Sequence, residues 1–267
     1  MAAQKTVGVY DLNGTRVREA KLPKVFATPV RPDLIKRAVL SMQANRRQAF
    51  GASILSGLQT SAHYHGVKDT KYSMKNKEMA RGPRVHESSP GQTYRMRRVP
   101  QAVGGREAHP PMVGKILRQK INEKEKRIAI CSAIAASAVK EMVEKRGHKF
   151  EIELPIIVSN DIENILKVKE FEKILNALKL EGEMERAKIK SIRAGKGKAR
   201  GRKYKKRKSI LVVAEGSRLK KIVKSFPGID VSTAGMLNAE LLAPGCQAGR
   251  LVIWSENAIK KLEEKYG

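Results

Sequence analysis

The sequence predicts an α/β fold in which helices flank a largely parallel sheet, together with a long extended basic loop. Three observations predict this fold. Short continuous apolar runs alternate with segments of helical periodicity through the second half of the 267-residue chain. Residues 49–111 show neither helical nor strand periodicity, yet strong core sequence follows them. The formal net charge of +29 is concentrated in a few segments.

The N-terminal elements follow from local patterns. Residues 5–22 alternate between apolar and polar side chains around Asn13-Gly14, a dipeptide typical of tight turns, so we expect a β-hairpin. Pro32 suits the first turn of a helix. Apolar residues then recur at helical spacing, which predicts a helix over residues 32–47 with one buried face: Leu34, Ile35, Ala38, Val39 and Met42.

The next segment lacks the material for a core. Only 8 of the 68 residues in 45–112 are Leu, Ile, Val or Phe, well below the fraction of about 20% that folded segments need. We therefore expect residues 49–111 to be a loop that is disordered alone and takes its shape from a partner. The predicted globular domain comprises residues 1–48 and 112–267.

Regular structure resumes at Asn122. An N-x-x-E capping pattern at Asn122 and Glu125 predicts the start of an Ala-rich helix that ends near Gly147. Apolar runs then predict strands at 154–159, 209–214, 228–233 and 250–254. Helical sequence is predicted between and after them, at 162–178, 218–226, 237–242 and 256–266.

The positive charge marks two segments. Residues 186–208 hold 13 Lys and Arg and no acidic residue, and residues 45–112 hold 12 basic and 4 acidic residues. Residues 209–267, in contrast, hold 8 basic and 6 acidic residues. Such concentration favours docking of basic arms onto a polyanion rather than a uniformly basic surface. Residues 186–208 are expected to be a nucleic-acid-binding segment within the globular domain.

Motifs for catalysis are missing from the sequence. The nearest match to a dinucleotide fingerprint, at residues 195–200, has Arg200 where the last glycine belongs, and no P-loop is present. We therefore expect Rossmann-like layers without a nucleotide site. His63 and His65 lack further ligands at metal spacing, and two cysteines make no disulfide framework. The sequence predicts no catalytic residue, no metal and no cofactor, and it has no apolar run of about 18 residues for a membrane span.

The basic segments suit RNA. Arg and Lys are interleaved with glycines, which let the backbone approach phosphates. Tyrosines in these segments offer stacking platforms for bases, although packing within the loop explains each of them equally well: Tyr64, Tyr72, Tyr94 and Tyr204. The charge lies on irregular segments rather than on a groove-reading helix, which favours folded RNA over duplex DNA.

Four longer motifs carry a resemblance. They are VRPDLI (30–35), YRMRRVPQAVGGREAHPP (94–111), GKGKARGRKYKKRK (195–208) and PGIDV with LNAELLAPGCQAGRLVIWSENAI (227–259). In these residues the chain resembles the universal large-subunit ribosomal protein four family, in its archaeal and eukaryotic branch. One departure is Cys246-Gln247, where relatives often have Gly or Ala followed by His.

The resemblance implies a cytoplasmic, non-enzymatic protein of the large ribosomal subunit. Its partners would be ribosomal RNA, neighbouring large-subunit proteins and, at the loop tip, the nascent peptide in the exit tunnel. Positions matching the family's RNA-binding segments are Arg95, Arg97, Arg98, Gly104, Gly105, Arg106, Lys196, Lys198, Arg200, Arg202, Lys203 and Tyr204. The expected tunnel-tip residues are Arg81, Gly82 and Arg84.

Two other functions are weighed against this one. An RNA-processing enzyme would need a phosphate-binding glycine motif, which the sequence lacks. A DNA-compacting protein would share the basic charge, and competition between folded RNA and duplex DNA distinguishes it from the leading interpretation.

Overall fold

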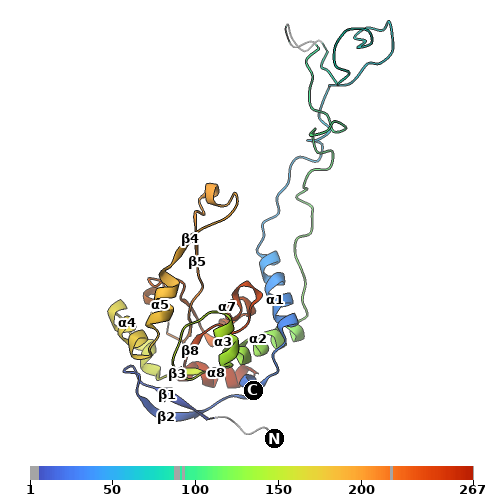
Figure 1. The fold of residues 1–267 in the computed structure, drawn as a ribbon. Coiled ribbons are helices and arrows are strands. Elements are labelled where there is room, and N and C mark those ends of the chain that lie inside the picture. The colour runs from blue at the N-terminus through green and yellow to red at the C-terminus, as the bar shows by residue number, and fades with distance from the viewer. Residues whose placement is uncertain (1–5, 87–90, 92–93, 217–218, 267) are drawn as a thin grey trace. The chain divides into compact units, whose positions relative to one another are not determined.

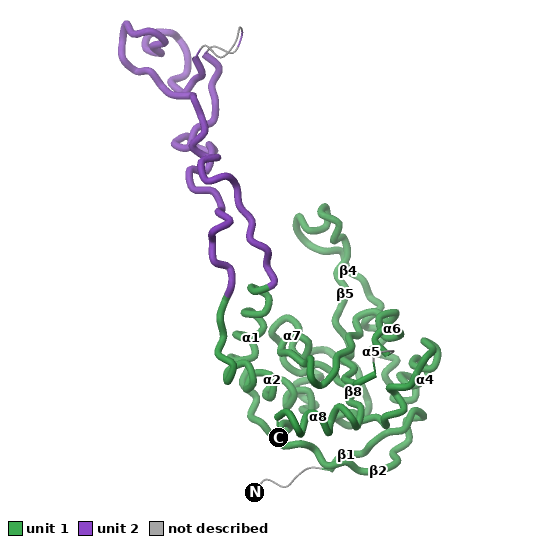
Figure 2. The backbone as a smooth tube through the Cα atoms, turned by 180° about the vertical axis from the view of Figure 1, so that it is seen from behind, with its two compact units in different colours: residues 1–45, 119–267 green, residues 46–118 purple. Residues whose placement is uncertain are grey.

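The computed structural model describes residues 6–86, 91, 94–216 and 219–266. The chain divides into two compact units (Figure 2). Unit 1 comprises residues 1–45 and 119–267, and unit 2 comprises residues 46–118.

Unit 1 is built on a six-stranded sheet with the order β2-β1-β3-β8-β6-β7 (Figure 1). Its strands are β1 (Thr6–Tyr10), β2 (Arg16–Lys21), β3 (Ile156–Val158), β6 (Leu211–Val213), β7 (Asp230–Ser232) and β8 (Val252–Ser255). Only the β1–β2 pair is antiparallel; the other neighbours are parallel. The predicted α/β class and the N-terminal hairpin are therefore confirmed, with Gly14 in the turn at a φ of 77°.

Helices cover both faces of this sheet. They are α1 (Pro32–Asn45), α2 (Glu123–Ser137), α3 (Lys140–Lys145), α4 (Val168–Ala177), α5 (Glu181–Lys188), α6 (Leu219–Val223), α7 (Ala239–Leu242) and α8 (Glu256–Tyr266). Short 3-10 helices lie at Lys24–Ala27, Asn160–Asn164, Lys198–Arg200, Ala234–Met236 and Pro244–Cys246.

The strands supply two cores because successive side chains point to opposite faces. Ile157 and Trp254 pack with α1, α2, α7 and α8, whereas Ile156 and Ile253 pack with α3, α4, α5 and α6. These strand residues are fully buried. Burial on both faces explains why the strands read as continuous apolar runs in the sequence.

The prediction of a single helix from Asn122 to Gly147 is wrong, because the chain forms the two helices α2 and α3 there. Val139, between them, is extended at φ −92° and ψ 112°. The Ser137 hydroxyl donates to the Ile134 carbonyl at 2.7 Å, a local bond that competes with continuation of the helix. The predicted capping box is also wrong, since the Asn122 side chain makes no capping bond and Glu125 accepts a bond from Arg37 Nη1 at 3.0 Å.

Helix α5 was not predicted from the sequence, and it carries a buried carboxylate. Glu183 is fully buried and accepts hydrogen bonds from four residues. The donors are His148 Nδ1 at 2.8 Å, the Lys149 amide at 3.1 Å, Ser209 Oγ at 2.7 Å and Arg186, whose Nε and Nη2 lie 2.7 and 2.6 Å from the two carboxylate oxygens. Burial raises the pKa of Glu183, but the bonds from Arg186, His148 and Ser209 outweigh it and lower the pKa to about 2.

This carboxylate holds together the two ends of the basic segment 186–208. Arg186 lies just before the segment's first strand, and Ser209 directly follows its last residue. Arg186 Nη2 also donates to the Lys208 carbonyl at 3.0 Å. Next to it, the buried Arg250 donates to the Ser209 carbonyl at 2.7 Å and pairs with Asp230 at 2.7 Å. The base of the basic segment is therefore fixed by charge pairs that solvent does not screen.

We predict that Glu183→Gln lowers the free energy of unfolding at pH 7 by about 3–5 kcal/mol, because Arg186 loses its buried partner. The folded-state pKa of Glu183 lies below its ordinary value of 4.5. Its contribution is thus complete above about pH 4.5 and is lost as the pH falls through about 2. Urea unfolding across this range measures the effect.

Glu185→Gln, on the exposed face of the same helix, is the matched control and is expected to unfold like the wild type. A gap between wild type and Glu183→Gln that stayed constant down to pH 2 would contradict the assigned charge.

Candidate nucleic-acid interface

Most of the basic segment 186–208 forms a β-hairpin that projects from the body of unit 1 (Figure 1). Its strands are β4 (Lys190–Ile192) and β5 (Tyr204–Lys206), and both are exposed along their whole length. Lys190 lies directly opposite Lys206 in the register. Like charges placed opposite each other destabilise a strand pair, so this hairpin favours a bound polyanion.

The hairpin brings together six residues predicted from the sequence. Lys196, Lys198, Arg200, Arg202, Lys203 and Tyr204 are all exposed on its outer strand and tip. Arg193 Nε donates to the Arg202 carbonyl at 2.9 Å, which holds the two sides of the tip together. Tyr204 is 52% exposed and pairs with Ile192, which is 67% exposed. The half-exposed ring of Tyr204, over which Lys203 Nζ lies 5.6 Å from the centroid, is suited to stacking on a base.

A basic groove lies at the base of the hairpin. Its volume is about 560 Å³, and its lining includes five lysines: Lys188, Lys190, Lys206, Lys208 and Lys224. The carboxylate in its lining, Asp230, already pairs with Lys208 Nζ at 2.9 Å and with Arg250. The groove therefore has a cationic wall of the kind that binds phosphates.

Lys224 was missed by the sequence analysis. It follows α6, far along the chain from the basic run, and lies in a segment of ordinary charge. No local pattern distinguishes it from other surface lysines. Its place in the groove follows from the packing of α6 against β7.

Unit 2 holds the remaining predicted residues. Arg95, Arg97, Arg98 and Arg106 are exposed, whereas Arg84 is 9% exposed. Arg84 donates to the carbonyls of Tyr94 and Ala80 at 2.7 and 2.9 Å. Its guanidinium thus binds the unit's own backbone, while Arg81 is exposed and Gly82 is partly buried.

Two chain segments run side by side in unit 2. The Ala52 amide donates to the Pro111 carbonyl at 3.0 Å, and Arg106 donates to the Gln59 carbonyl. A Cβ at Gly57 would lie 1.6 Å from the Glu107 carbonyl oxygen, so only glycine permits this approach. Gly104 and Gly105 lie in a turn in which the Gly105 amide donates to Ala102 at 2.9 Å.

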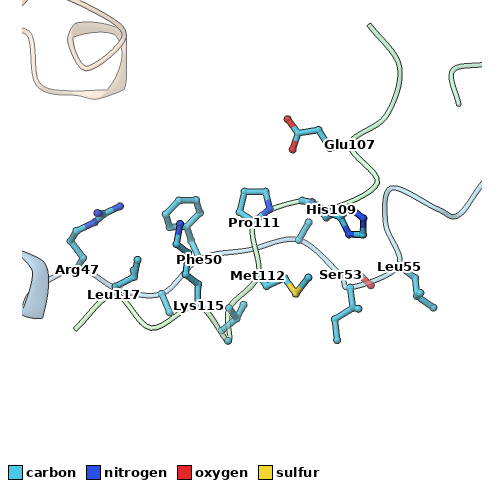
Figure 3. A pocket seen from close by; sticks show the side chains of 16 residues that line it. Arg47, Phe50, Ser53, Leu55, Glu107, His109, Pro111, Met112, Lys115 and Leu117 are labelled. Carbon is cyan, nitrogen blue, oxygen red and sulfur yellow. The ribbon is translucent and has the colours of Figure 1, made fainter. Parts of the chain in front are cut away.

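An apolar groove lies between these segments, where residues 47–55 face residues 107–117 (Figure 3). Its volume is about 1580 Å³, and Phe50, Pro111 and Met112 line it. Several apolar side chains here are open to solvent, including Phe50 at 62% and Ile54 at 71%. Contiguous exposed apolar surface of this kind is typical of a site that another molecule covers.

Ligands for a metal are found at one place among the described residues. His63, His65 and His86 bring their ring nitrogens within 4.8 Å of one another. None of the helices in the described part of the chain is both long and apolar enough to span a membrane.

Together, the fold and its cationic surfaces define the class of protein: an α/β domain with exposed basic extensions. Comparison with known families then narrows the class. The model of the ribosomal protein L4/L1 family matches residues 20–265. The chain belongs to this family, and the resemblance seen in the sequence motifs is confirmed.

Archaeal relatives match nearly end to end. The large ribosomal subunit protein uL4 of Methanococcoides burtonii is 48% identical over 97% of this chain and 98% of its own. The protein of the same name from Methanocaldococcus jannaschii is 49% identical over 97% of this chain and 98% of its own length. The protein of the same name from Haloquadratum walsbyi is 43% identical over 96% of this chain and 98% of its own length. The family is structural, so the expectation that this chain is not an enzyme is confirmed.

We predict that replacing Lys188, Lys190 and Lys224 with Gln weakens the binding of a single-stranded oligonucleotide. The binding constant is also expected to depend less steeply on salt concentration. Three lost phosphate contacts reduce the slope of log K against log salt by about 2. Fluorescence anisotropy at several salt concentrations measures this slope.

A variant with Lys169, Lys173 and Lys260 replaced by Gln removes equal charge from exposed positions elsewhere on unit 1. We expect it to change the slope much less. Equal effects in the two variants would show that only net charge matters and would refute the groove.

Proposed function

We propose that this protein is a structural component of the large ribosomal subunit in the cytoplasm, where it binds and organises ribosomal RNA. The observation that carries the proposal is the β4–β5 hairpin. Its segment holds 13 basic and no acidic residues, and Lys190 faces Lys206 across the strands. The name of the relatives, large ribosomal subunit protein, supports the same conclusion.

The electrostatics favour RNA phosphates as the partner of the hairpin. Repulsion among its cations opposes the folded hairpin until an anion of high charge density neutralises them. Lys196, Lys198 and Lys203 suit phosphates as point charges, while Arg200 and Arg202 can also bind them in a bidentate manner. Tyr204 adds base stacking, which RNA with unpaired bases can accept.

We further propose that residues 49–111 form a loop embedded in ribosomal RNA, while residues 1–48 and 112–267 form the globular domain. The exposed Arg95, Arg97 and Arg98 support RNA contact along this loop. The loop tip, with Arg81, Gly82 and Arg84, reaches the wall of the nascent-peptide exit tunnel, as the family resemblance implies. In this arrangement Arg84 positions the backbone at Tyr94 and Ala80, and the exposed Arg81 meets the nascent peptide or the RNA.

Neighbouring large-subunit proteins are the remaining proposed partners. The apolar groove of unit 2 supports a partner with apolar surface, because Phe50 and Ile54 are open to solvent in the chain alone. Arg47 and Lys115 also line this groove, but its exposed apolar side chains suit a protein surface better than phosphates.

We predict that binding to ribosomal RNA is dominated by electrostatics. Six to ten phosphate contacts lose about 10³–10⁵-fold in affinity between 50 and 200 mM salt. Filter binding of folded ribosomal RNA fragments measures this loss, with duplex DNA as competitor at equal salt. Weak dependence on salt, or equal competition by duplex DNA, would refute specific RNA binding.

Deleting residues 52–108 tests the loop. We expect the shortened protein to unfold cooperatively like the full chain, because the two cores lie outside the deleted residues. We also expect assembly of the large subunit to stall in cells that depend on the shortened protein. Denaturant unfolding and sucrose-gradient profiles measure the two effects. Loss of cooperative unfolding would contradict the proposed division into domain and loop.

A further inference from the structure

Unit 2 brings together three histidines that the sequence separates. His63 and His65 stand two residues apart, so they share one side of an extended segment. His86 comes from a second segment, which pairs with the first through two backbone bonds between His63 and Arg84, at 3.0 and 3.3 Å. A third segment pairs with the second, since Val85 exchanges bonds with Tyr94 and Arg95. The three rings therefore meet where three strand-like segments are joined.

The rings lie close enough to share one ion. Their centroids are 4.3 Å apart for His63 and His65, 4.5 Å for His63 and His86, and 4.8 Å for His65 and His86. Ring nitrogens of the three lie within 4.8 Å of one another. Nitrogens bound to one tetrahedral zinc ion lie about 3.3 Å apart, as follows from bonds of about 2.0–2.1 Å. Small side-chain rotations close this difference.

Hydrogen bonding selects the form of His63 that binds metals. Its Nδ1 lies 3.0 Å from the Ser61 carbonyl oxygen, which can only accept, so Nδ1 carries the proton. The lone pair of Nε2 is then free, and this atom directly contacts His65 Nε2. Two facing nitrogens need a proton or a cation between them. A carbonyl bonded to the other nitrogen is also the usual second partner of a metal-bound histidine.

The surroundings of His86 favour a metal ion over a proton between His63 and His65. Both of its ring nitrogens are buried, and neither has a hydrogen-bond partner among the described residues. The hydroxyl of Tyr72 is also buried without a partner, and its ring lies 4.4 Å from that of His86. A proton shared by His63 and His65 does nothing for His86, whereas a metal ion engages one nitrogen of His86 as a third ligand.

We propose that His63, His65 and His86 bind one zinc ion, with water in the fourth position. Three imidazoles without carboxylates favour zinc over magnesium or calcium, which prefer oxygen ligands. Residues 45–112 are poor in large apolar side chains. A metal ion therefore supplies a cross-link where a hydrophobic core cannot form.

Isothermal titration of the metal-free, full-length protein with zinc chloride tests the site. We expect one zinc ion per chain and at least about 100-fold weaker binding in His86→Gln, because a ligand is removed. His109→Gln removes a histidine of unit 2 outside the cluster and is the matched control, expected to bind like the wild type. Absence of stoichiometric binding by the wild type, or equal binding by His86→Gln, would overturn the proposal.

A second variant keeps a ligand in place. His65→Cys replaces imidazole by thiolate, which also binds zinc and cobalt. With cobalt chloride we expect this variant to gain a thiolate charge-transfer absorption that the wild type lacks, and its absence counts against the site. Both measurements use protein without RNA, so failure of RNA binding and failure of zinc binding are distinguishable.

Discussion

The buried carboxylate of Glu183 is the contact on which the cationic surface of unit 1 depends. It gathers donors from His148 after α3, from Arg186 in α5 and from Ser209 just before β6. A hairpin of strongly repelling cations must be held at its base by something other than its own strands. Because Glu183 is shielded from water, its pairing with Arg186 keeps its strength where exposed pairs would be screened.

The same repulsion links structure to function. The α/β domain is stabilised by two apolar cores that any aqueous environment maintains, whereas the hairpin gains stability only when its charge is neutralised. In the proposed complex with RNA, neutralisation of the exposed Lys190–Lys206 pair favours the bound state over the free one.

Unit 2 is stabilised by other contacts than unit 1. It has few large apolar residues, and its described contacts are mainly backbone bonds, ring contacts and the buried Arg84. The buried guanidinium of Arg84 donates hydrogen bonds to the Tyr94 and Ala80 carbonyls, so these two backbone groups have a partner. The histidine cluster lies beside this contact and concentrates the unit's unsatisfied donors and acceptors.

Local patterns in the sequence determined three features: the strands of the sheet, the start of α1 at Pro32 and the location of the positive charge. The strands read as apolar runs because both faces of the sheet are buried, and Pro32 suits a first helical turn because of its fixed backbone geometry. The charge follows directly from the composition of each segment. Composition marked residues 186–208 as basic but did not predict the β4–β5 hairpin, and the residues from Lys196 to Tyr204 were named from the family resemblance, so their contact with RNA stays a prediction. Only the tertiary structure decided the burial of Glu183, the position of Lys224 in the groove and the contact of His86 with His63. Each of these depends on a partner distant in sequence, and no periodicity or composition records which distant residues will pack together.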